Sequence, residues 1–147
     1  MNIYKYFKHP EILNGYDDAI FHVPELAYEA IQKYGDIEPR WVRAVATDAK
    51  LSCFYAYLII KARFPQGEHA ISKDAHQSAW YASHVVHGRF EAGEKAISKD
   101  ANSSASYALK ALKTRFPEGE KTIIKYVEDG YDSEDPLIYY DKYLSDF

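Results

Sequence analysis

The sequence of 147 residues contains a single cysteine, Cys53, and no long apolar run. One cysteine excludes an intrachain disulfide and any zinc site built from several cysteine ligands. No stretch reaches the about 18 apolar residues that a membrane-spanning helix needs. The N-terminal residues also lack the apolar core of a secretory signal peptide. These absences favour a cytoplasmic protein.

Sequence motifs of common catalytic sites are missing as well. There is no G-x-S-x-G nucleophile motif, no H-E-x-x-H zinc motif and no glycine-rich phosphate loop, because the seven glycines stand apart from one another. Cys53 falls on a stripe of small residues, where a buried thiol is expected rather than a nucleophile. We therefore expect a protein that is not an enzyme and that uses no cofactor and no metal.

Acidic residues outnumber basic ones, and the net charge is −4. This negative net charge disfavours sequence-independent binding to a nucleic-acid backbone but is compatible with a local basic strip. Aromatic residues make up 16% of the chain, and 14 residues are tyrosines. Because tyrosine joins an apolar ring to a polar hydroxyl, it suits half-exposed packing and partner surfaces.

The most informative feature is an internal repeat of 26 residues. The stretches 63–88 and 89–114 are identical at 14 of 26 positions. Residues 37–62 match 63–88 at seven positions, and 115–125 match the start of the unit at seven of 11. Internal repeats of this period indicate stacked supersecondary units.

Each unit is predicted to fold as a short helix followed by a long one. The segment RFPxGE places a proline in the first turn of the short helix, with Glu68 near the positive end of the helix dipole. Asp74 is a typical N-cap for the long helix. Small and apolar residues then recur at helical spacing from Ala75 through Val86 to Arg89.

The sequence predicts an all-α protein with a single domain over residues 1–147. Because such helix pairs bury their apolar faces by stacking, we expect a short right-handed helical-repeat solenoid of about three 26-residue units over 37–126. Residues 1–36 are expected to form an N-terminal helical cap, with a helix over 24–34 that Gly35 ends. The acidic and aromatic residues 127–147 are expected to form a C-terminal cap.

The repeats resemble short tandem helical repeats common in tailed-bacteriophage proteins of unassigned function. The matching text is RFPQGEHAISKDA at 63–75, RFEAGEKAISKDA at 89–101, RFPEGEKTIIK at 115–125, and Ser-x-x-Tyr-Ala at 78–82 and 104–108. The resemblance covers about residues 44–125 and departs from the pattern at Glu91, where a proline is expected, and at both caps. It implies a phage or prophage origin and action inside a bacterial cell, and it carries over no catalytic residue.

Several charged and aromatic residues recur once per unit. We interpret the arginines and the glutamates five residues after them as structural ion pairs or carbonyl caps; they are Arg63, Arg89 and Arg115, with Glu68, Glu94 and Glu120. We interpret Tyr55, Tyr81 and Tyr107 as packing between units with the hydroxyl near the surface.

Repeated lysines support an alternative function. Lys73, Lys99 and Lys125 share one position of the unit, and Lys113 shares another with Lys61 and His87. A row of cations at constant spacing is able to follow a nucleic-acid backbone. Nucleic-acid binding is therefore the alternative hypothesis.

Positions that differ between units are better candidates for recognition. The predicted partner-binding residues are Tyr57, Trp80, His84 and His87, among which Trp80 is the favoured anchor because tryptophan is common at the centre of interfaces. His84 and His87 lack a third ligand for a metal. The main hypothesis is a non-catalytic protein that binds a protein of the bacterial host or of the phage, as an inhibitor or adaptor.

Overall fold

The computed structural model describes residues 18–36, 38–130 and 145–146, and all regular elements in these ranges are helices. The prediction of an all-α protein is thus confirmed. The described part begins with a short 3-10 turn, η2 (Asp18–Phe21), and with α2 (Pro24–Tyr34), which Gly35 ends at a φ of 84°. The helix predicted over 24–34 is confirmed. Most of the predicted C-terminal cap and residues 1–17 of the N-terminal cap lie outside the described residues.

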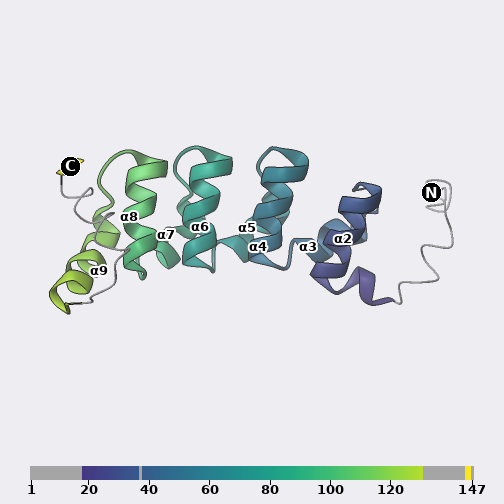
Figure 1. The fold of residues 1–147 in the computed structure, drawn as a ribbon, viewed down its shortest axis with the longest axis horizontal. Helices are drawn as coiled ribbons and strands as arrows, with labels where there is room; N and C mark the ends of the chain where they lie inside the picture. Colours follow the sequence, from purple (N-terminus) through teal and green to yellow (C-terminus); the bar gives the residue numbers. More distant parts are fainter. Residues whose placement is uncertain (1–17, 37, 131–144, 147) are drawn as a thin grey trace.

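Short and long helical segments alternate from Pro39 onward. The first helix of each pair begins 26 residues after the one before; these helices are α3 (Pro39–Val45), α5 (Pro65–Ile71), α7 (Glu91–Ile97) and α9 (Pro117–Glu128). Each long segment starts as an α-helix and continues in wider π-type turns; the three are α4 with η3 (Ala49–Phe54, Tyr55–Ile60), α6 with η4 (Ala75–Tyr81, Ala82–Val86) and α8 with η5 (Ala101–Ser106, Tyr107–Leu112). Figure 1 shows the three long segments side by side in one row, with α5 and α7 connecting them.

Aspartates begin the long helices. The side-chain oxygen of Asp74 accepts a hydrogen bond from the backbone N–H of Gln77 at 2.8 Å, and Asp48 and Asp100 act in the same way at 2.7 Å. Each carboxylate satisfies one of the N–H groups that a helix N-terminus leaves without a partner. The predicted N-cap at Asp74 is confirmed.

Residues in the left-handed conformation end the long helices. Lys61, His87 and Lys113 have φ values of 52°, 54° and 55°, and the N–H of His87 bonds back to the carbonyl of Ala82. The expectation that the helix face extends to Arg89 is wrong, because this turn ends the helix at Val86 and redirects the chain. A non-glycine residue in this conformation gives no signal in the helical periodicity.

Buried serines and glycines join neighbouring helices. Ser78 is fully buried, and its Oγ donates to the carbonyl of Ile71 at 2.7 Å, which fixes the long helix to the end of the short helix before it. The backbone of Gly93 on α7 lies against the same serine, since a Cβ built on Gly93 would be 2.6 Å from the Ser78 Cβ. The same contacts recur at Ser52 with Gly67 and at Ser104 with Gly119. The Ser–Gly contact sets how closely successive helix pairs approach.

We expect Gly93→Ala to lower the free energy of unfolding, measured by urea denaturation. Overpacking costs about 1–3 kcal/mol, which exceeds the roughly 1 kcal/mol by which alanine is the better helix former. Gly88→Ala is the matched control, because a Cβ at Gly88 meets no atom within 4 Å. Equal stability of the two variants would show that the Ser–Gly contact is not tight.

Candidate partner-binding site

The repeated arginines and glutamates form one ion pair in each corner between helix pairs. Arg63 donates from Nε and Nη2 to the two carboxylate oxygens of Glu68, at 2.8 and 2.9 Å. Arg89 with Glu94 and Arg115 with Glu120 repeat this geometry. The interpretation as structural ion pairs is confirmed. Since each guanidinium already faces a carboxylate, the three arginines do not form an unpaired basic row.

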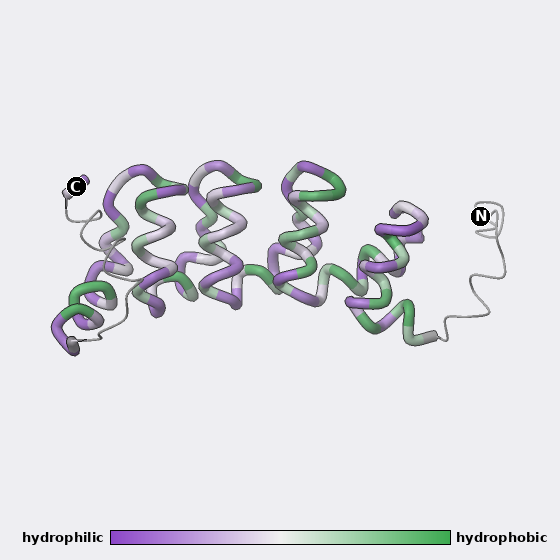
Figure 2. The backbone as a smooth tube through the Cα atoms, viewed as in Figure 1, coloured by the Kyte–Doolittle hydropathy of each residue, from purple (hydrophilic) through white to green (hydrophobic). Residues whose placement is uncertain are grey.

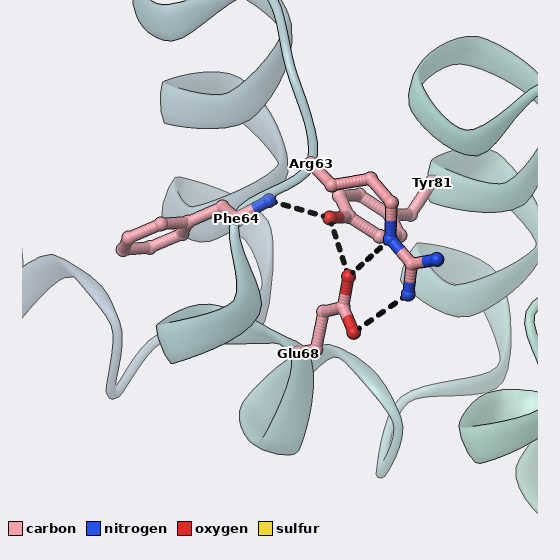
Figure 3. Close-up of polar contacts among 4 residues, drawn as sticks. All are labelled: Arg63, Phe64, Glu68 and Tyr81. Atoms are coloured by element: carbon pink, nitrogen blue, oxygen red, sulfur yellow. Dashed lines mark hydrogen bonds and ion pairs between the residues drawn. The ribbon is translucent and has the colours of Figure 1, made fainter.

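A buried tyrosine completes each of the first two corners. Figure 3 shows the Tyr81 hydroxyl between Phe64 and Glu68: it accepts from the Phe64 N–H at 2.7 Å and donates to Glu68 Oε1 at 3.0 Å. Phe64 caps α5, so its N–H has no partner inside the helix. Burial, followed by the bond to Glu68, raises the pKa of Tyr81 to about 12.

Contrary to the prediction, the hydroxyls of these tyrosines do not lie near the surface. Tyr107 repeats the arrangement with Phe90 and Glu94, and both Tyr81 and Tyr107 are fully buried. The prediction is wrong because the orphan N–H at the start of the short helix needs an acceptor inside the protein. Tyr55 differs, since its hydroxyl bonds Asp36 at 2.9 Å.

The lysines of the nucleic-acid hypothesis are exposed but occupy separate places. Lys73 and Lys99 precede the N-caps of long helices, whereas Lys113 follows the C-terminus of one, and Lys125 lies on α9. A long helix of 12 residues spans about 18 Å. The lysines before and after the long helices therefore lie at opposite ends and do not form one strip.

The solvent-facing side of the long helices is a distinct surface, which we call the long-helix face. Five exposed or partly exposed positions on each helix form it: Lys50, Phe54, Tyr57, Leu58 and Lys61; His76, Trp80, Ser83, His84 and His87; and Asn102, Ser106, Leu109, Lys110 and Lys113. None of the five positions has one residue type in all three helices. By contrast, the buried serine and tyrosine positions are identical in all three. The buried serine and tyrosine positions therefore recur, whereas the positions of the long-helix face differ between units.

Aromatic side chains gather where the first two long helices meet. The Trp80 and His84 rings stack with centroids 4.4 Å apart and planes at 12°, and His84 Nδ1 is 2.9 Å from the Trp80 carbonyl oxygen. Tyr57 meets both rings edge-on, with its centroid 5.3 Å from that of Trp80. Phe54 also meets the Trp80 ring edge-on, with the two ring centroids 6.4 Å apart. Three of the four predicted partner-binding residues therefore form one cluster.

Two grooves flank the Trp80–His84 stack. The larger one, of about 580 Å³, lies between η3 and η4, and its lining includes Tyr57, Leu58, Lys61, Val85 and His87. The fourth predicted residue, His87, lines this larger groove together with Tyr57 and His84, and it is connected to the cluster by the groove and not by a ring contact. The smaller groove, of about 170 Å³, lies between the second and third long helices, and Lys110 lines it. Phe54 was not among the predicted site residues, although it occupies the same position of its unit as Trp80.

Two further features bear on the chemistry of the described residues: the single cysteine and the grouping of metal-ligating side chains. Cys53 is fully buried as predicted, and burial, with smaller contributions from Asp74 and Asp48, raises its thiol pKa to about 12. A thiol in this state is protonated at neutral pH and does not act as a nucleophile. Within the described ranges, no three His, Cys, Asp or Glu side chains are grouped so that they could hold a metal.

No protein-family model, curated protein sequence or solved structure matches the chain. None of the helices over the described residues has the length and apolar character needed to cross a membrane.

Removal of the Tyr81 hydroxyl tests the corner network. We expect Tyr81→Phe to lower the free energy of unfolding by about 1–3 kcal/mol, because it leaves the buried Phe64 N–H without an acceptor. Tyr57→Phe, at a side chain that is 46% exposed, is the control and is expected to change stability by less than about 0.5 kcal/mol. Urea denaturation of both variants measures the difference. A similar loss in the two variants would contradict the role of the buried hydroxyl.

Fluorescence quenching by acrylamide tests the aromatic cluster. Trp41 is fully buried and Trp80 is partly exposed, so Trp80 is expected to supply the quenchable emission, which Trp80→Phe removes. His84→Ala uncovers one face of the Trp80 ring and should increase quenching. His69→Ala, at an exposed position on α5 that lines neither groove beside the stack, should leave quenching unchanged. An unchanged quenching constant in His84→Ala would contradict the stacked geometry.

Proposed function

We propose that this chain is a non-catalytic helical-repeat protein that binds a protein partner through the long-helix face. In this proposal the helix pairs form a short right-handed solenoid of about three 26-residue units with helical caps. The partner is a protein of a bacterial host or of a phage, which the chain inhibits or recruits in the cytoplasm. The observation that carries the proposal is the cluster of Tyr57, Trp80 and His84 beside a groove of about 580 Å³.

The cluster has the composition of an interface centre. Tryptophan and tyrosine supply most of the binding energy at many interfaces because they bury a large area with few rotatable bonds. Trp80 is held in place by His84 and Tyr57, so little side-chain entropy is lost when a partner covers it. Among the described residues, Tyr57 and Leu58 are two of four large hydrophobic side chains classed as exposed, and they are adjacent.

Nucleic-acid binding is the second candidate. Its support is the combination of aromatic rings and lysines on the long-helix face, which is typical of surfaces that bind single strands. Its weakness is that Arg63, Arg89 and Arg115, the side chains best shaped for phosphate, are each paired with a glutamate. The net charge of −4 also opposes approach to a polyanion. We therefore favour a protein partner.

Affinity capture from nuclease-treated bacterial lysate tests the proposal. The immobilised full chain is expected to retain a stoichiometric protein, and Tyr57→Ala/Trp80→Ala is expected to lose it because the interface anchor is removed. The control His69→Ala/Lys95→Ala changes two exposed residues of the short helices and should retain the protein. Circular dichroism confirms that both variants are folded. Capture of nucleic acid alone without nuclease, or equal protein capture by the two variants, would contradict the proposal.

A further inference from the structure

We infer that the partner presents an acidic polypeptide segment to the long-helix face and places an aromatic or large aliphatic side chain in the groove between η3 and η4. This inference rests on the proposed function and adds the chemistry of the partner. It follows from the distribution of charge over the face, from the lining of the groove and from the positions of the lysines around the aromatic cluster.

Charge on the long-helix face is of one sign. The chain as a whole has 22 acidic and 18 basic residues. None of the residues of the long-helix face is acidic, and it holds the lysines Lys50, Lys61, Lys110 and Lys113 together with three histidines. A positive face on a protein of negative net charge selects an acidic partner surface.

The groove between η3 and η4 is suited to an apolar anchor. Its lining includes the exposed side chain of Leu58, the ring of Tyr57, and Val85 on the facing helix. Residues 58–60, at the end of η3, are strongly hydrophobic (Figure 2). A volume of about 580 Å³ lies within the range of ligand-binding clefts, about 300–1,000 Å³. One aromatic or large aliphatic side chain of a partner can be covered there.

Lysines flank the anchor position on both sides. Lys61 lines the same groove as Tyr57 and His87, and Lys110 lines the smaller groove beyond the Trp80–His84 stack. A segment that crosses the stack from one groove to the other therefore meets a cation before and after its apolar residue. A partner segment that fits this arrangement has Asp or Glu on both sides of a Trp, Phe or Leu.

The surroundings of Trp80 favour a polypeptide over a nucleic acid. His84 covers one face of the indole ring, and Tyr57 and Phe54 pack against it edge-on. The platform for stacking successive bases is thus reduced, whereas Tyr57, Leu58 and Val85 in the adjoining groove offer apolar contacts to a side chain. Base stacking on open rings carries much of the affinity of single-strand binders.

Fluorescence anisotropy with the full chain tests the inference. The probes are a labelled 15-residue peptide with Trp and Leu among Glu and Asp, the same peptide with every acidic residue replaced by Gln or Asn, and a labelled dT15 oligonucleotide. We expect the acidic peptide to bind at least tenfold more tightly than the neutral peptide and than dT15. Lys61→Glu/Lys110→Glu should weaken the acidic peptide at least tenfold, because it reverses the charges that flank the anchor.

A matched variant distinguishes the effect of the charges beside the anchor from the effect of the net charge of the chain. Lys95→Glu/Lys121→Glu makes the same change in net charge at exposed positions on α7 and α9, and it should weaken the acidic peptide less than twofold. An equal loss in the two charge variants would overturn the inference, since binding would then follow net charge alone. Circular dichroism verifies that both remain helical.

The remaining outcomes distinguish the inference from the proposed function. If the neutral peptide binds as tightly as the acidic one and Trp80→Ala abolishes both, the inference fails while the long-helix face remains the binding site. If neither peptide binds at 1 mM while the wild-type chain captures a protein in a Trp80-dependent way, the inference also fails alone. Tighter binding of dT15 than of the acidic peptide, lost in Lys61→Glu/Lys110→Glu, would overturn both.

Discussion

The hydrogen bond from the Phe64 N–H to the Tyr81 hydroxyl is the interaction on which the arrangement of the helix pairs depends. It satisfies a buried donor at the start of a short helix with a side chain from the long helix that follows. The same hydroxyl donates to Glu68, which Arg63 holds from the solvent side. The first two corners each connect two helices through one tyrosine in this way. Because this network lies inside the protein, it leaves the opposite side of the long helix free to vary.

Close packing imposes the second constraint. Gly93 lies against Ser78 with no room for a Cβ, and Ser78 in turn bonds the carbonyl that ends α5. A larger residue at either position would separate neighbouring pairs. The repeated residues of the sequence thus form the same Ser–Gly contact between successive helix pairs. Because this contact is the same from unit to unit, equivalent positions on the outer side of the long helices lie next to each other.

Much of this arrangement could be predicted from sequence because its signals are local. Asp74 as N-cap, Gly35 as helix end and the Arg63–Glu68 pair each depend on residues a few positions apart. The buried Tyr81 hydroxyl and the turn at His87 could not be predicted, since one depends on a partner 17 residues away and the other on a left-handed non-glycine residue. The candidate site was predictable only in part. Variation between units pointed to Tyr57 and Trp80, but their contact comes from the stacking of helices.

Register also explains why the site lies where it does. Positions 54 and 80 are equivalent in units that pack side by side, so the Phe54 ring contacts the Trp80 ring. Tyr57, three residues after Phe54 on the same helix, contacts both Trp80 and His84. Trp80 and His84 are four residues apart and share one helix face, which permits them to stack. In the third long helix the equivalents are Ser106 and Lys110, so the aromatic surface ends there. Because the buried serine, glycine and tyrosine contacts are the same in each unit, the outer residues can change without disturbing the fold. The chain can therefore confine an aromatic, cationic surface to two neighbouring long helices.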